Sequence, residues 1–170
     1  MKIDLAIPRA AAFGAALAIA AVAGAPVAPA LAFDETSTSP VNVDEQNLIL
    51  RGYDPVAYQT EGEPVRGERD ITATHGDAVY RFASEANRER FLADPARYEP
   101  AFGGFCAMGV AMGMKLDGDP EIFHVIDDRL YVNIHEDAAR AWQRDVPTNI
   151  ARAEENWPRI RDRAPSELRD

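Results

Sequence analysis

Apolar residues change their spacing several times along this 170-residue chain, and each spacing predicts a different element. Between residues 71 and 82, two runs rich in β-branched and aromatic residues flank Gly76-Asp77, which is typical of a β-hairpin. Residues 122–126 and 130–134 repeat this pattern around Asp127-Asp128. Short helices are expected over 55–59, 85–93, 105–114, 136–144 and 149–160. This order predicts an α+β fold, a single small domain in which two short β-hairpins, or one small antiparallel sheet, pack with several short helices.

Capping residues mark two of the expected helix starts. Asp54 stands before Pro55, which predicts an N-cap followed by proline at the first helical position. Ser84 is the expected cap of the helix over 85–93. The last two helices are amphipathic and are expected to enter one core. Their core residues would be Ala138, Trp142, Ile150, Ala153, Trp157 and Ile160.

The first 32 residues have the pattern of a cleavable signal peptide. Lys2 and Arg9 precede an uncharged, alanine-rich stretch, and Ala30-Leu31-Ala32 ends it. We predict cleavage before Phe33 and a bacterial protein that is periplasmic or secreted; an uncleaved N-terminal anchor is the alternative. Spanning a bilayer takes about 20 apolar residues, so no membrane span is expected after cleavage. The mature chain is divided into a flexible lead-in rich in Ser, Thr and Pro (33–42), a domain (43–163) and a C-terminal tail (164–170).

Charge and cysteine content narrow the possible functions. The predicted mature chain has 138 residues, of which 16 are basic and 27 acidic, a net charge of −11. Such a surface repels phosphate backbones, so no nucleic-acid partner is expected. Cys106 is the single cysteine and cannot form an internal disulfide. In an oxidising compartment an odd thiol is buried and inert, paired with another molecule, or chemically used.

Several segments resemble the YHS domain. They are residues 75–84 (HGDAVYRFAS) and 91–98 (FLADPARY), while 52–58 (GYDPVAY), 103–107 (GGFCA) and 149–158 resemble the exported branch of that family. The resemblance covers nearly all of residues 43–160. YHS domains of metal-handling proteins carry two cysteines where this chain has Ala83 and Asn87, so it lacks those thiolate ligands. The exported branch includes selenoproteins with selenocysteine at the position of Cys106, which implies thiol chemistry there.

Cys106 is the main candidate for chemistry on physical grounds as well. It follows Gly103 and Gly104 and falls in the first turn of the helix expected over 105–114, where unpaired N–H groups favour a thiolate. The alternative is a small buried residue at a tight helix contact. A reactive thiol needs a nearby base, and His75 is the preferred partner, which makes Cys106 and His75 the catalytic candidates. Pocket candidates are Tyr53, Asp54, Gly103 and Gly104.

A soft metal ion such as copper is the cofactor that these residue types would suit, because thiolate and thioether ligands favour Cu(I). The candidate ligands are Cys106, His75 and Met114. In a helix over 105–114, Met108 and Met112 lie about 200° and 240° around from Cys106, so both are expected in the core. The other polar candidates are expected to serve structure: His124 in the core or at a sheet edge, and His135, Asp117 and Asp119 in solvent.

Three functions remain open from the sequence. The first is a redox or detoxification protein that uses the Cys106 thiol with a small-molecule or thiol partner. The second is a non-catalytic copper-binding module of the cell envelope. The third is a structural or interaction domain with an inert Cys106. The sequence does not decide whether the protein is an enzyme, nor its oligomeric state.

Overall fold

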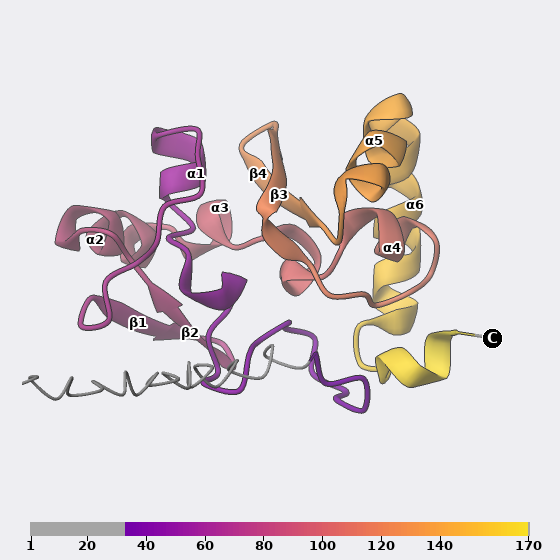
Figure 1. Ribbon diagram of the computed structural model, residues 1–170, viewed down its shortest axis with the longest axis horizontal. Helices are drawn as coiled ribbons and strands as arrows, with labels where there is room; N and C mark the ends of the chain where they lie inside the picture. The colour runs from indigo at the N-terminus through magenta and orange to yellow at the C-terminus, as the bar shows by residue number, and fades with distance from the viewer. Residues whose placement is uncertain (1–32, 170) are drawn as a thin grey trace, which may run out of the picture.

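The computed structural model describes residues 33–169, so the signal-peptide prediction lies outside the described residues. The fold confirms the α+β prediction: two separate two-stranded antiparallel sheets pack with short helices (Figure 1). In chain order the elements are η1 (Leu50–Gly52), α1 (Ala57–Thr60), β1 (Thr72–His75), β2 (Ala78–Arg81), α2 (Glu85–Ala93), α3 (Pro95–Tyr98), η2 (Ala101–Gly104), α4 (Ala107–Ala111), β3 (Asp119–Ile126), β4 (Arg129–Asn133), α5 (Glu136–Arg144), α6 (Val146–Ile160) and η3 (Pro165–Leu168).

The β3–β4 hairpin divides the molecule into two halves. Side chains alternate between the two faces of a strand, and β4 uses both faces. Leu130 and Val132 belong to an apolar cluster with β1, β2 and α1–α3, whereas Tyr131 belongs to a second cluster with α4, α5 and α6. Figure 1 shows the two sets of elements on opposite sides of this hairpin. The last two helices enter one core as expected: Trp142, Ala153 and Ile160 belong to the second cluster, and Ile150 and Trp157 pack against it. Ala138 is only partly buried, and the buried alanine of α5 is its neighbour Ala139.

Turn and cap chemistry explain the elements that were predicted well. Asp127 and Asp128 both have positive φ (49° and 59°), as a two-residue hairpin turn requires. The Ser84 side chain accepts a hydrogen bond from the Asn87 N–H at 3.2 Å, which confirms the cap of α2. Both α2 and α5 have the predicted bounds.

Asp54 does not cap the helix that follows it. Helix α1 begins at Ala57, and its N-cap position is Val56. Asp54 is fully buried: Oδ1 accepts from the Val56 N–H at 2.8 Å, and Oδ2 accepts from the Ala83 N–H at 2.8 Å and from Asn87 Nδ2 at 2.7 Å. A carboxylate with two oxygens can accept several donors, so Asp54 joins the chain before α1 to the start of α2.

The helix after Gly104 is shorter than predicted. Helix α4 covers only Ala107–Ala111, and Gly113, with φ +80°, ends it in a left-handed turn. Before it, Phe102, Gly103 and Gly104 are all left-handed. At Gly103 a Cβ would stand 2.0 Å from the carbonyl oxygen of Pro40, so the close approach of residue 40 requires glycine.

Residues 33–42, which we call the strap, are held against the domain, unlike the flexible lead-in that their composition predicts. Ser166 N–H donates to the Glu35 carbonyl at 2.9 Å, and Asn42 N–H donates to the Gly103 carbonyl at 2.9 Å. Lys115, fully buried, donates from Nζ to the carbonyl oxygens of Ser39, Arg161 and Arg163 at 2.8, 3.0 and 2.8 Å. Those backbone acceptors are far apart in sequence, which is why composition gives no sign of them.

Among residues 33–169, no helix is both long enough and apolar enough to cross a membrane.

Candidate functional site

Cys106 lies between η2 and α4 and is fully buried. It occupies the N-cap position of α4, and its Sγ accepts a hydrogen bond from the Gly109 N–H at 3.4 Å. Its own N–H donates to the Leu116 carbonyl at 2.9 Å, and its carbonyl accepts from the Val110 N–H at 2.9 Å. The backbone on both sides of the thiol is therefore fixed, and the sulfur position is well defined.

Burial raises the pKa of the Cys106 thiol above its ordinary value. Backbone hydrogen bonds from Gly109, Ile134 and Met108 lower it, but they offset only part of the desolvation. The expected thiolate of a helix first turn is therefore not favoured at neutral pH. Two facts explain this outcome: α4 has only five residues, and the sulfur has lost its hydration.

Asn133 contacts Cys106 and was not foreseen from the sequence. It is fully buried at the end of β4, and its Oδ1 accepts from the Met108 N–H at 3.2 Å and lies 3.7 Å from Cys106 Sγ, within reach of the thiol proton. Its Nδ2 is buried with no hydrogen-bond partner among the described residues. Its position two residues after Tyr131 places it on the strand face toward the second cluster, which is the signal that could have identified it.

An open groove of about 350 Å³ lies over Cys106. Its walls come from α4, the turn after it and the start of α5, and they are mostly apolar. The lining residues are Cys106, Met108, Gly109, Met112, Met114, Leu116, Ile134, His135, Asp137, Ala138 and Ala141. All three methionines within residues 33–169 therefore line the same groove as the single cysteine.

The expectation of a core position is wrong for Met112, whereas Met108 is partly buried and packs against the second apolar cluster. Met112 is 62 % exposed, and Met108 is partly exposed. The angles expected between these side chains and Cys106 hold only for a continuous helix through residue 114, but α4 ends at Ala111. The left-handed turn at Gly113 reverses the chain, so that Met114 also reaches the groove lined by Cys106.

His135 is the histidine that lines this groove. It is exposed, as predicted, but it also serves as the N-cap of α5, where its Nδ1 accepts from the Ala138 N–H at 3.1 Å. In a neutral imidazole that accepts at Nδ1, the proton resides on Nε2. His135 is therefore poorly prepared to offer Nε2 as a metal ligand while it caps the helix.

The structure does not bring His75 to Cys106. His75 Nε2 lies 2.5 Å from Glu99 Oε1, and the imidazole ring packs edge-on against Tyr80 and Phe91. It lines a different cavity, of about 280 Å³, which is not lined by Cys106. A common site for the two proposed catalytic residues therefore has no geometric support.

The four pocket candidates also lie away from the groove. The Tyr53 hydroxyl donates to Glu121, and the Arg66 guanidinium lies 4.0 Å from the centre of the Tyr53 ring. Burial and the Glu121 hydrogen bond raise the pKa of Tyr53. Asp54 is enclosed by the donors described above. Gly103 and Gly104 line two other cavities and serve the left-handed backbone there.

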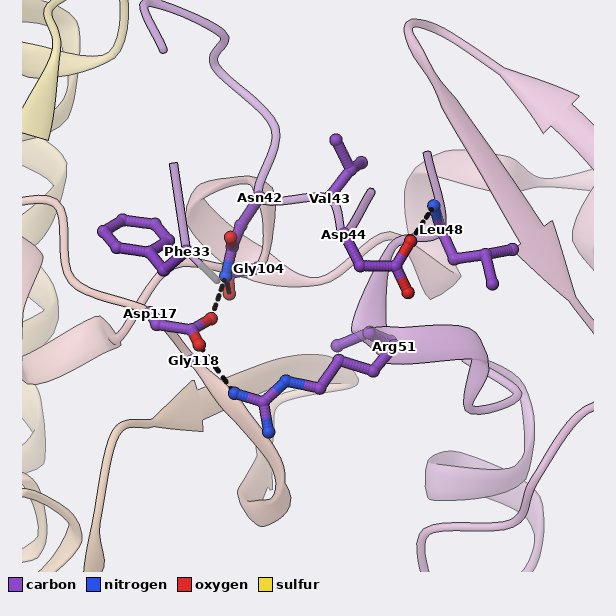
Figure 2. Close-up of a pocket in the computed structure, with 10 residues that line it drawn as sticks. Phe33, Asn42, Val43, Asp44, Leu48, Arg51, Gly104, Asp117 and Gly118 are labelled. Atoms are coloured by element: carbon purple, nitrogen blue, oxygen red, sulfur yellow. Dashed lines mark hydrogen bonds and ion pairs between the residues drawn. The ribbon is translucent and has the colours of Figure 1, made fainter. Parts of the chain in front are cut away.

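Figure 2 shows the cavity beside Gly104, where two side chains contact the Asp117 carboxylate. Arg51 Nη2 contacts Asp117 Oδ2 at 2.6 Å, and Asn42 Nδ2 donates to Oδ1 at 2.9 Å. Arg51 Nη1 lies 4.0 Å from Asp119. The cavity measures only about 20 Å³, enough for a single water molecule. The turn that contains Asp117 therefore connects the strap to η1 through side-chain contacts, whereas the sequence predicted a solvated loop.

Metal-ligating residue types do not gather elsewhere in the described part of the chain. No group of three or more His, Cys, Asp or Glu side chains within residues 33–169 is arranged to hold a metal ion. At the two positions where YHS domains of metal-handling proteins carry cysteines, the Asn87 side-chain amide and the Ala83 N–H both donate to the Asp54 carboxylate. Hydrogen bonds to one carboxylate thus occupy that location.

Comparisons of the chain with family models, with curated proteins and with solved structures found no match.

Proposed function

We propose that this protein is a non-catalytic binding module for a soft metal ion, most simply Cu(I). The observation that carries the proposal is the gathering of Cys106, Met108, Met112 and Met114 on one groove. Thiolate and thioether sulfur are soft ligands of the kind that Cu(I) prefers. The chain has Ala83 and Asn87 where YHS domains of metal-handling proteins carry cysteines, so the proposal rests on this groove and not on the resemblance.

The surroundings of Cys106 favour binding over nucleophilic catalysis. The thiol is buried, its pKa is raised by that burial, and no histidine donates to it or accepts from it among the described hydrogen bonds. A nucleophilic thiol needs a base or a lowered pKa. A bound soft cation would instead stabilise the thiolate directly, and the N–H groups of Gly109 and Met108 would add to that stabilisation.

The test is a Cu(I) titration of reduced protein against a chromophoric Cu(I) chelator. We expect one ion per chain, with binding abolished in Cys106→Ser and weakened in Met112→Leu and Met114→Leu, which keep the side-chain volume but remove the sulfur. Leu92→Met is the matched control, because it adds an exposed thioether outside the groove. Absence of Cu(I) uptake by folded, reduced protein would overturn the proposal.

A redox role for Cys106 is the second candidate, and one observation favours it. The Gly109 N–H donates to the sulfur at 3.4 Å, and such a donor also stabilises the anionic sulfenate that oxidation produces. The readout is the mass of native protein after exposure to peroxide and a sulfenate-trapping reagent. A trapped adduct in native protein supports this role, whereas a thiol that reacts only after denaturation eliminates it.

We further propose that the chain is exported and cleaved before Phe33, as residues 1–32 suggest. The intact mass of protein recovered from the periplasm or medium tests this. A mass that includes residues 1–32 would overturn it.

A further inference from the structure

A second cavity, of about 280 Å³, lies where the two halves of the molecule meet. The end of β1 supplies His75 and the turn after it Asp77, β2 supplies Tyr80, the link after α3 supplies Glu99, and α6 supplies Trp157. Strap residues 40 and 41 complete one wall. Segments that are distant in sequence thus bring polar side chains and an aromatic ring to one concave surface, which is a common property of small-molecule sites.

Tyr80 is the side chain that most clearly lacks a partner. Only 3 % of it is exposed, and its ring is held against Phe91 at a centroid distance of 4.5 Å. No described residue hydrogen-bonds to its hydroxyl. Burial and the Glu99 carboxylate raise the pKa of Tyr80, so the hydroxyl keeps its proton and remains a donor. The Tyr80 hydroxyl is not one of the fully buried unpaired polar atoms of the described residues, so it keeps access to the cavity that Tyr80 lines and can donate to a ligand or water there.

Both acceptors and donors line the rest of the cavity. His75 holds Oε1 of Glu99 at 2.5 Å and so fixes the carboxylate, whose second oxygen has no partner among the described residues. Asp77 adds another carboxylate, and Arg161 adds a guanidinium whose Nε lies 3.4 Å from Asp162. An anionic ligand would face two carboxylates, and a cationic ligand would face the guanidinium. The charges therefore favour a neutral ligand that both donates and accepts.

Trp157 provides the apolar contact for such a ligand. Its indole is fixed by rings on its inner side, with Phe102 at 5.9 Å and Phe105 at 6.0 Å between centroids. It is partly exposed and lines the cavity. Hydroxyl groups on a compact carbon ring meet these requirements together, because each hydroxyl can donate to a carboxylate and accept from Tyr80 or Arg161, while the C–H face packs on an aromatic ring.

We propose that this cavity binds a neutral polyhydroxylated molecule of monosaccharide size. The proposal is independent of the metal groove, because the two cavities share no lining residue. Tyr80 donates to a ligand hydroxyl, Glu99 and Asp77 accept from others, and Trp157 packs against the ring. An open cavity of this volume excludes water only partly, so we expect dissociation constants in the millimolar range.

The experiment is an amide and indole NMR titration of full-length mature protein with glucose, galactose, mannose and N-acetylglucosamine. Acetate and ethylammonium serve as anionic and cationic probes. We expect saturable shifts with at least one sugar at Gly76, Asp77 and the Trp157 indole, and none with the charged probes. Tyr80→Phe should weaken binding about tenfold, since one hydrogen bond is removed without a change of shape. Tyr98→Phe is the matched control, because Tyr98 is buried outside this cavity.

Three results would overturn the proposal. One is the absence of saturable shifts at this cavity with all four sugars. Another is binding that Tyr80→Phe leaves unchanged while the variant remains folded. Preferential binding of acetate or ethylammonium at the same residues would also reject a neutral ligand. The Cu(I) titration is run on the same Tyr80→Phe protein, and an unchanged Cu(I) affinity shows that the variant is intact.

Discussion

Asp54 and Cys106 are both fully buried and both precede a short helix, yet their surroundings differ. Asp54 accepts three hydrogen bonds of 2.7–2.8 Å and lines neither the groove nor the two other cavities described above. Cys106 makes two long sulfur contacts, of 3.4 and 3.7 Å, beneath an open groove. A buried group with all its partners supplied by the chain serves stability. A buried group with weak partners next to open space is free to take another one.

The strongest test of this contrast is Asp54→Ala. It leaves the N–H groups of Val56 and Ala83 and the Asn87 amide without an acceptor, so we expect about 3–5 kcal/mol lower unfolding free energy in urea. Asp54→Asn keeps one oxygen acceptor and should lose about half as much. Under conditions where Asp54→Ala is still folded, its Cu(I) affinity should match the parent. A variant as stable as the parent would remove Asp54 from this role.

Asn133→Leu tests whether the groove has a structural support of its own. The substitution leaves the Met108 N–H unpaired and removes the acceptor near Cys106, so we expect about 1–2 kcal/mol lower stability by urea denaturation. Because the Met108 N–H loses the acceptor that holds it beside Cys106, Cu(I) affinity should also fall. Asn149 is another buried asparagine, and its side chain donates to two carbonyl groups of α5. Asn149→Leu is therefore the control, which should lower stability without changing the Cu(I) affinity. Equal metal affinities in both variants would contradict a positioning role.

Cys106→Ala should have the opposite profile to Asp54→Ala. The sulfur makes only weak hydrogen bonds, so we expect a stability loss of about 1 kcal/mol from the small space left behind. Cu(I) binding should be lost completely. Thermal unfolding and the chelator competition measure the two effects on one sample. A large stability loss together with unchanged metal binding would reverse the contrast with Asp54.

The smallest expected effect concerns pH and lies outside both sites. His124 is partly buried on β3, its Nδ1 has no partner in the described structure, and burial lowers its pKa below 6.5. The unfolded chain therefore takes up a proton at His124 before the folded protein does, so stability falls as pH decreases below 6.5. His124→Gln should flatten this part of the stability–pH curve, measured by urea unfolding at pH 5–8. An unchanged curve would assign the acid effect to other groups.

Local sequence signals predicted the elements whose ends depend on neighbouring residues. Turn residues at 76–77 and 127–128 set the two hairpins, and Ser84 set the start of α2. Asp54 was misread, because its side chain bonds to Ala83 and Asn87, about 30 positions away, and no local rule includes such partners. The short α4 was missed because a close approach by residue 40 fixes the left-handed backbone before it.

The amino-acid sequence alone determined the α+β fold class and the positions of its hairpins and longer helices. It also indicated Cys106 as the main candidate for chemistry. Only the tertiary structure decided that Met108, Met112 and Met114 share a groove with that thiol, and that His75 belongs to another cavity. It also reversed the expected direction of the Cys106 pKa shift. The physical reason is that hairpins and caps arise from contacts within a few residues, whereas desolvation and shared cavities depend on segments that meet only after folding.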